Sequence, residues 1–387
     1  MSFFEYYFND YDFSKKETAV CCPFPHHTEN GIEYFETNPS AHINKDKGLF
    51  HCKVCDKGLS EIAFIAEILG CTYESATKIN KLFTTKEDIF TWTNNVDLPE
   101  EQHKIANELG ISDKVIKDLS IASEVGDELA FPVTMFGKMV DVRSYRPHDR
   151  ANKIRSRVGS ISGLIIPFDI WKDTDPSKWT IICAGEKDMA VCRSHGFNAI
   201  TLTGGEKATP RFINPFKNRK IAICYDNDEA GITGAKALAA YLYQYVQEVK
   251  VVTGFHEICK EHGEDITDFF TKYNGTAEQL KDYIVNAPAF TQEEAREETV
   301  KRCPIVTLLE ASKPQYINRV VQSNVQVVAT YEKAMPVPTT IYAKKVNSTG
   351  DLKHNQMLVG EERNWELNEQ NCQDILKLID NNFTEEQ

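Results

Sequence analysis

The clearest pattern in the chain lies between residues 179 and 285, where short apolar runs alternate with longer stretches of helical spacing. Four of these runs have the length and composition of buried strands, namely Trp179–Cys183, Ala199–Leu202, Ile221–Cys224 and Val249–Val252. Short apolar runs separated by helices are typical of a parallel sheet that has helices on its outside. Ligands of such sheets bind beyond the carboxyl ends of the strands. This segment therefore predicts an α/β domain with its site at that edge.

The residues on either side of this segment follow other patterns. Ser60–Leu69 and Glu74–Leu82 have the spacing of amphipathic helices. Residues 129–145 alternate as two strands, and Gly137 between them predicts a tight hairpin turn. Beyond residue 303, β-branched residues alternate over 324–331 and 339–345. We expect a small β-rich region there, of the kind found in an OB-fold, that serves DNA binding or docking, and a terminal helix over 371–379.

Composition limits the classes of protein to which the chain can belong. Its 387 residues are enough for two to four domains, and no apolar run approaches the roughly 20 residues of a membrane span. The N-terminus lacks the pattern of a signal peptide, so we expect a cytoplasmic protein whose eleven cysteines are reduced or bind metal. The net charge of −13 argues against a chain that coats nucleic acid with its whole surface.

One segment is basic although the chain as a whole is acidic. Residues 138–157 contain seven Lys or Arg against two Asp. Arginine side chains suit phosphate oxygens, so this hairpin is a candidate contact for nucleic acid or triphosphates. The alternative is an ordinary solvated face of a hairpin. The candidate contacts for nucleic acid and nucleotide are Arg143, Arg146, Lys153, Arg155 and Arg157.

Acidic residues follow two of the predicted strands. Asp226 and Asp228 come directly after Ile221–Cys224, and residues two apart on an extended chain point to the same side. Paired carboxylates there can bind Mg²⁺, which prefers hard oxygen ligands. The alternative is that Asp228 only caps the following helix. Further acids stand in similar places, at Glu186 and Asp188 after the first strand and at Asp265 and Asp268 before a late helix.

A second candidate metal site lies near the N-terminus. Cys52 and Cys55 have the spacing of a zinc-binding pair, and Cys22 with His26 supplies the other half of a tetrahedral site. Zn²⁺ takes soft thiolate and imidazole ligands, and a closed structural site folds the segment around the ion. The adjacent His27 is an alternative ligand to His26.

The acidic motifs resemble the TOPRIM module of DnaG-type primases, topoisomerases and some nucleases. Its usual first motif is Glu-Gly-x-x-Asp, and this chain has Ala184-Gly185-Glu186-Lys187-Asp188, with Ala184 at the position of the Glu. The resemblance implies that Glu186 takes over as general base or metal ligand, together with catalytic Asp226 and Asp228. The Mg²⁺ ligands that it implies are Asp226, Asp228, Asp188, Asp265 and Asp268.

The N-terminal motifs resemble the zinc-binding domain of DnaG-type and bacteriophage primases. They are Cys-Pro-Phe (22–24), Asn-Pro-Ser (38–40) and Gly-x-Phe-His-Cys-x-x-Cys-x-x-Gly (48–58). The family has two residues between the first Cys and the His, and this chain has three. The resemblance implies a zinc ribbon that reads the single-stranded template, and in that family a basic subdomain precedes the TOPRIM module.

Together the two resemblances imply an α/β multidomain bacteriophage-type DNA primase. We expect a zinc ribbon over 1–85, a basic subdomain over 97–175, a TOPRIM domain over 176–287 and a β-rich region over 303–387. The implied cofactors are structural Zn²⁺ and catalytic Mg²⁺ or Mn²⁺. The implied partners are single-stranded DNA, nucleotide triphosphates and a replicative helicase. A TOPRIM nuclease and a non-catalytic template-binding subunit are the alternatives.

Overall fold

The computed structural model describes residues 2–28, 30, 32–84, 98–123, 128–149, 154–156, 160–302, 325–330, 340–345 and 365–366. The chain divides into two compact units, of residues 1–235 with 245–288 and of residues 236–244 with 289–387. All candidate site residues that the structure describes belong to the first unit. Within the described ranges, no helix is long and apolar enough to span a membrane.

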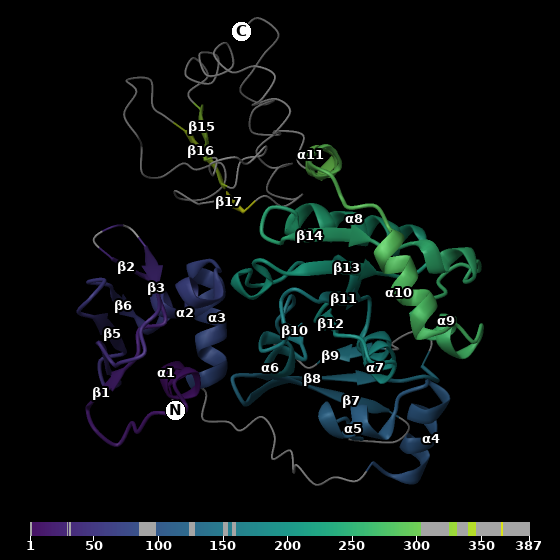
Figure 1. Cartoon of the computed structure of the whole chain (residues 1–387), viewed down its shortest axis with the longest axis horizontal. Coiled ribbons are helices and arrows are strands. Elements are labelled where there is room, and N and C mark those ends of the chain that lie inside the picture. The colour runs from purple at the N-terminus through teal and green to yellow at the C-terminus, as the bar shows by residue number, and fades with distance from the viewer. Residues whose placement is uncertain are drawn as a thin grey trace, which may run out of the picture. The chain divides into compact units, whose positions relative to one another are not determined.

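The N-terminal residues form a small antiparallel sheet with three helices. The sheet has the order β1-β4-β5-β6, from strands Glu17–Val20, Ala41–Asn44, Leu49–Cys52 and Gly58–Ser60 (Figure 1). A separate hairpin pairs β2 (His26–His27) with β3 (Glu33–Tyr34). The helices are α1 (Phe3–Tyr7), α2 (Glu61–Leu69) and α3 (Tyr73–Thr84), and the last two confirm the predicted amphipathic pair.

Phe64 of α2 is the centre of the N-terminal core. Its side chain is fully buried. Ring centroids between 5.1 and 6.5 Å away surround it, from Phe3, Phe4, Tyr7, Phe8, Phe24 and Phe50. Aromatic rings bury large areas and gain further from edge-on contacts, so this cluster supplies much of the apolar burial that so small a sheet lacks.

A second antiparallel sheet lies between the N-terminal residues and the α/β segment in the sequence. Helices α4 (Glu100–Glu108) and α5 (Asp113–Asp118) precede it. Its strands have the order β7-β8-β9 and are Leu129–Met135, Lys138–Tyr145 and Ile154–Ser156. The predicted hairpin is confirmed, and Gly137 at its turn has φ +76°, a conformation that glycine adopts without strain.

The α/β segment contains the predicted parallel sheet. Its order is β10-β12-β11-β13-β14, from strands Ile165–Ile166, Trp179–Cys183, Ala199–Leu202, Lys220–Cys224 and Glu248–Val251, named here in chain order from β10 to β14 (Figure 1). Only the short β10 runs antiparallel to its neighbour. Four consecutive residues of each of β11, β12 and β13 are buried, as expected for strands covered on both faces.

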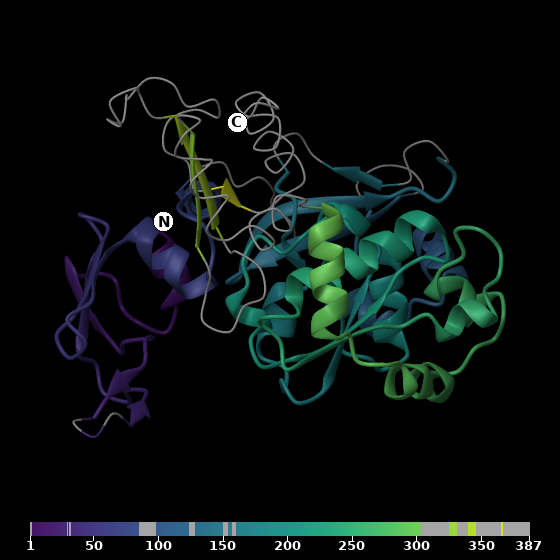
Figure 2. The same ribbon diagram turned by 90° about the horizontal axis from the view of Figure 1, so that it is seen from above.

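Helices of this segment lie outside its strands, as the teal and green ribbons show from above (Figure 2). They are α6 (Phe168–Lys172), α7 (Glu186–Ser194), α8 (Glu229–Leu242), α9 (Ile266–Thr271) and α10 (Ala277–Asn286). Three single 3₁₀ turns connect the elements, at Gly205–Lys207 (η1), Asn214–Phe216 (η2) and Gly254–Glu257 (η3). Because α7 joins β11 to β12 and α8 joins β13 to β14, the carboxyl ends of these strands share one edge.

The C-terminal unit contributes α11 (Gln292–Arg302) and a small antiparallel sheet. Its strands are β15 (Val325–Thr330), β16 (Thr340–Lys345) and β17 (Trp365–Glu366), in that order. The two strands predicted beyond residue 303 are therefore confirmed. The helix predicted over 371–379 lies outside the described residues, and the OB-fold stays a prediction.

We expect Phe64→Ala to destabilise the N-terminal core by about 3–5 kcal/mol, because a large buried ring leaves a cavity that its neighbours cannot fill. Thermal unfolding of the full chain measures the effect. Tyr73→Ala on α3 is the matched control, since Tyr73 is 60% exposed and its loss is expected to cost less than about 0.5 kcal/mol. Equal unfolding temperatures for the two variants would contradict the role given to Phe64.

Candidate metal centres

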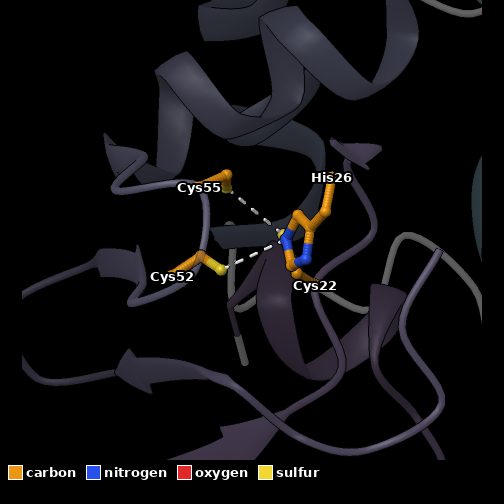
Figure 3. Close-up of side chains that lie close together, drawn as sticks. All are labelled: Cys22, His26, Cys52 and Cys55. Atoms are coloured by element: carbon orange, nitrogen blue, oxygen red, sulfur yellow. Dashed lines mark hydrogen bonds between the residues drawn. The ribbon is translucent and has the colours of Figure 1, made fainter. Parts of the chain in front are cut away.

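The four predicted zinc ligands converge in the N-terminal sheet. Ligand atoms of Cys22, His26, Cys52 and Cys55 all lie within 4.8 Å of one another. The Cys22 and Cys55 sulfurs are 3.9 Å apart, and the Cys52 sulfur is 3.4 Å from Nε2 of His26 (Figure 3). Three thiols and one imidazole in so small a volume are compatible with a tetrahedral Zn²⁺ site.

The surroundings of His26 fit such a metal ligand. The side chain is 1% exposed, and while Nε2 faces the thiols, Nδ1 lies 3.2 Å from Oε1 of Glu36. The other oxygen of Glu36 accepts the hydroxyl of Ser40, whose Oγ lies 3.3 Å from the Cys52 sulfur. A carboxylate behind a ligating imidazole fixes its tautomer and orientation. Sequence spacing gave no signal for Glu36, because its role depends on the fold of the β2–β3 hairpin.

Hydrogen bonds favour ionisation of one of the four ligands. Burial raises the pKa of the Cys52 thiol, but bonds from the Ser40 hydroxyl and from the backbone amides of Cys55 and Val54 outweigh it and lower the pKa to about 6. Burial raises the pKa of Cys22. Because zinc binds thiolates, a thiol that ionises below neutral pH provides a ready first ligand.

The structure distinguishes the two adjacent histidines. His27 is exposed and pairs with Glu33 across the hairpin, whereas His26 is buried among the cysteines. Neighbouring residues of a strand point to opposite faces, so only one of the two can face the cluster. The geometry therefore favours His26, the ligand expected from the sequence.

We expect His26→Ala to lose most of the bound zinc and His27→Ala to keep one zinc per chain. Elemental analysis of the purified full-length chains measures the metal content. Glu36→Gln is expected to weaken zinc binding by about 10–100-fold, the usual effect of removing a carboxylate behind a metal ligand. Equal zinc content in the two histidine variants would place the nitrogen ligand elsewhere.

The second cluster lies at the carboxyl edge of the parallel sheet. Carboxylate oxygens of Asp188, Asp226 and Asp265 lie within 4.8 Å of one another. Asp188 belongs to the first turn of α7 after β11, Asp226 follows β13, and Asp265 is the N-cap of α9. Three oxygen donors of this kind are compatible with Mg²⁺ or Mn²⁺.

These carboxylates are partly removed from water and repel one another, and both effects raise the pKa values of Asp226 and Asp188. Burial, then the charges of Asp188 and Asp265, raise the pKa of Asp226 to about 9. Burial, then the charge of Asp265, raise the pKa of Asp188 to about 7. A divalent cation among them would offset both the repulsion and the lost hydration.

Lys187 and Thr267 support the cluster, and the sequence did not single them out. Nζ of Lys187 forms ion pairs with Asp188, at 3.3 Å, and with Asp265. Although burial opposes it, the charges of Asp188 and Asp265 raise the pKa of Lys187. The Thr267 hydroxyl donates to Oδ1 of Asp188 at 2.6 Å. Both residues lie inside acidic motifs, Lys187 in the first and Thr267 between Asp265 and Asp268, and this position was the signal available.

Asp228 and Asp268 lie outside this group of three. The chain turns after β13, where the amide of Asp228 donates to the carbonyl of Asp226, so the expected extended backbone is absent. Oδ1 of Asp228 instead accepts the amide of Gly231 at 2.7 Å in the first turn of α8, as the capping alternative predicted. Asp268 forms a capping box with Asp265.

Glu186 lies outside the group as well. Its Oε1 accepts from Nε of Arg143 in β8 at 2.8 Å, and the two side chains are 3% and 9% exposed. The Arg143 guanidinium also donates to the Ser156 hydroxyl in β9. Because Gly185 is the N-cap of α7, helix begins at Glu186, and Glu186 does not follow Ala184 on an extended strand. The catalytic role of Glu186 stays a prediction.

The basic segment is partly paired with acids. Arg146 forms an ion pair with Glu128, Nε to Oε2 at 2.9 Å. Arg155 in β9 is exposed, whereas Lys153 and Arg157 lie outside the described residues. Of the five predicted contacts, Arg155 is therefore the described one that offers its charge most openly to solvent.

Comparison with known proteins agrees with this site. A protein-family model described as Toprim-like matches residues 181–269, which contain all three acids of the cluster. No curated protein matches the chain. The TOPRIM module predicted from the acidic motifs is therefore confirmed for this segment.

The chain is also similar to solved structures of primases. The zinc-binding and RNA polymerase domains of the Aquifex aeolicus primase are 16% identical, with a TM-score of 0.41 over 80% of this chain and 90% of that one. A DnaG primase catalytic domain bound to single-stranded DNA is 13% identical, with a TM-score of 0.42 over 65% and 93%. The primase fragment of the bacteriophage T7 primase-helicase is 17% identical, with a TM-score of 0.35 over 68% and 100%.

We expect Asp226→Asn to stabilise the metal-free protein at pH 8. The Asp226 carboxyl has its pKa raised from 3.8 to about 9 on folding, so the folded state holds a proton that the unfolded state has already lost. The contribution of Asp226 to the free energy of unfolding has its full value below about pH 4 and is lost as the pH rises toward 9. Asn does not ionise, so with chelator the variant is expected to unfold about 2 °C or more above the wild type.

With Mg²⁺ added, we expect the wild type to unfold at a higher temperature than Asp226→Asn. The ion stabilises the wild type and has little effect on the variant. Asp282→Asn on α10 changes an exposed carboxylate and serves as the control. Thermal unfolding with and without Mg²⁺ measures both effects. A variant that melts below the wild type in chelator would contradict the strain assigned to the cluster.

Proposed function

We propose that this chain is a DNA primase, which makes short RNA primers on single-stranded DNA during replication. The observation that carries the proposal is the combination, in one chain, of three converging carboxylates in a Toprim-like segment, two of them buried and one half-buried, and a four-residue Cys/His cluster. Phosphoryl and nucleotidyl transfer depend on positioning and on charge stabilisation, which carboxylates and bound cations supply.

Asp188, Asp226 and Asp265 would hold the catalytic Mg²⁺ or Mn²⁺. When bound, such cations activate the attacking hydroxyl and neutralise charge on the triphosphate. Thr267 fixes the direction of one carboxylate by donating to Asp188. Lys187 reduces the repulsion between Asp188 and Asp265, and so keeps both carboxylates at the edge of the sheet.

Asp228 and Asp268 are proposed to act on the site through the backbone. Asp228 caps the start of α8, and Asp268 accepts the backbone amide of Asp265 at 3.3 Å. These contacts fix the backbone next to Asp226 and Asp265 where α8 and α9 begin. The role of Asp228 and Asp268 as direct metal ligands stays a prediction.

The basic hairpin is proposed to contact template and triphosphate. Arg143 is held in one direction by Glu186 and Ser156, and β8, its strand, packs on α7, the helix that carries Asp188. An arginine oriented by a buried carboxylate can present its remaining donors to a phosphate in a fixed geometry. Arg155 on β9, with Arg146, Lys153 and Arg157, is proposed to add contacts to the nucleic-acid backbone.

The Cys/His cluster is proposed to bind structural Zn²⁺ and to hold the N-terminal sheet as a zinc ribbon that selects the start site on the template. The other proposed partners are nucleotide triphosphates and a replicative helicase. We propose that the protein acts in the cytoplasm of a bacterium or of a phage-infected cell.

We expect the purified chain to synthesise labelled RNA de novo on single-stranded DNA with Mg²⁺ or Mn²⁺. Asp226→Asn is expected to lower the rate by about 100-fold or more, because a bound cation contributes several kcal/mol to such a reaction. The exposed Asp282→Asn is expected to retain the wild-type rate. Gel analysis of the RNA products measures both variants.

The same assay separates the two alternative classes. No RNA from the wild type with the DNA degraded would contradict the primase proposal and identify a Toprim-like nuclease. No RNA with intact, bound DNA would identify a template-binding subunit. RNA synthesis that survives Asp226→Asn would remove the catalytic assignment of the acidic cluster.

A further inference from the structure

A fourth carboxylate reaches the acidic site from a different part of the sheet. Glu206 lies in η1, the turn that follows β12, the strand next to β11. Glu206 lies beside Asp226, because both residues approach the same point of α8: a Cβ atom at Gly231 would lie within 3.0 Å of both Oε1 of Glu206 and the backbone nitrogen of Asp226.

One oxygen of this carboxylate has no partner. Oε1 of Glu206 is shielded from solvent and, among the described residues, makes no hydrogen bond. A buried polar atom without a partner destabilises the folded state, and a charged one does so more strongly. Such an atom next to Asp226 is expected where a cation or substrate group completes its bonding.

Two glycines of α8 make room for this arrangement. A Cβ atom at Gly231 would lie 2.9 Å from Oε1 of Glu206 and 2.3 Å from the carbonyl oxygen of Asp226. A Cβ atom at Gly234 would lie 2.6 Å from the backbone oxygen of Glu206. Residues three apart share one side of a helix. Glycine inside a helix is less favourable than alanine, so the close approach of Glu206 is maintained at a cost to the stability of α8.

The 3₁₀ turn η1, which carries Glu206, also lies close to the end of β11. A Cβ atom at Gly205 would lie 3.6 Å from the carbonyl oxygen of Ala184. Ala184 stands directly after β11 and offers only a methyl group, whereas Glu206, the residue that follows Gly205, carries a carboxylate. Glu186, the other acid near this position, already has its Oε1 engaged by Arg143.

We propose that Glu206 supplies, from the turn after β12, the carboxylate that Ala184 does not supply at the end of β11, and that Glu206 is a ligand of the divalent-cation site next to Asp226. The cradle of Gly231 and Gly234 holds it there. The role in primer synthesis rests on the proposed function, but the cation-binding role does not.

The test is a Mn²⁺ titration of the full-length chain, followed by electron paramagnetic resonance and by calorimetry. We expect Glu206→Gln to weaken Mn²⁺ binding by about 10–100-fold and Glu278→Gln, an exposed acid of α10, to leave it unchanged. Thermal unfolding in chelator shows whether Glu206→Gln is folded. Unchanged affinity in Glu206→Gln, or an equal loss in Glu186→Gln alone, would overturn the proposal.

The double variant Ala184→Glu with Glu206→Gln tests the proposed exchange of positions. We expect the double variant to bind Mn²⁺ at least tenfold more tightly than Glu206→Gln alone. Equal affinities in the two variants would overturn the assignment of Glu206 to that role. RNA synthesis is measured in parallel. Wild-type chains that bind Mn²⁺ through Glu206 but make no RNA would refute the proposed function alone, whereas RNA synthesis with unchanged Mn²⁺ affinity in Glu206→Gln would refute the Glu206 proposal alone.

Discussion

Mutual repulsion among closely placed carboxylates is the constraint on which the acidic site depends. One oxygen from each of Asp188, Asp226 and Asp265 lies within 4.8 Å of the other two, and burial raises the pKa of both Asp188 and Asp226. The folded chain tolerates this because Lys187 forms ion pairs with both Asp188 and Asp265. A site strained in this way is expected to bind a cation strongly, since the ion relieves repulsion that folding created.

The sheet and its helices place these acids with little freedom. Parallel strands end at a common edge, and a helix start follows each of β11 and β13. Helix N-termini favour carboxylates, because their free amides and the helix dipole stabilise negative charge. The caps formed by Asp228 and Asp265 therefore stabilise the helices and orient the site in the same contacts.

The N-terminal module obtains its stability in a different way. Its strands are only two to four residues long, so backbone pairing alone contributes little. The aromatic cluster around Phe64 packs one side, and the Cys/His cluster would tie the strands together through a metal ion. Glu36, two residues after β3, lies 3.2 Å from His26, so the chain that leaves the β2–β3 hairpin adds a carboxylate beside the Cys/His cluster.

Three features could be predicted from the chain: the strands of the parallel sheet, the hairpin around Gly137 and the cluster of three cysteines with His26. Hydrophobic periodicity and short Cys spacing are local properties of the sequence. The rule that parallel strands end at one edge placed Asp226 near the acids after β11, whereas Asp188 and Asp265 were expected as ligands from the resemblance to the TOPRIM module. The parts that could not be predicted depend on side-chain direction. Turns at Gly185 and Asp228, rather than extended backbone, moved Glu186 toward Arg143 and made Asp228 a cap.

By itself the sequence determined which residue types are available and which elements they belong to. Only the tertiary structure decided that Lys187 lies among the acids, that Glu36 lies behind His26, and that Glu206 lies beside Asp226. These contacts join segments that are distant in the chain or that point in directions set by a helix start. Sequence spacing carries no information about such contacts, because they depend on how strands and helices pack in three dimensions.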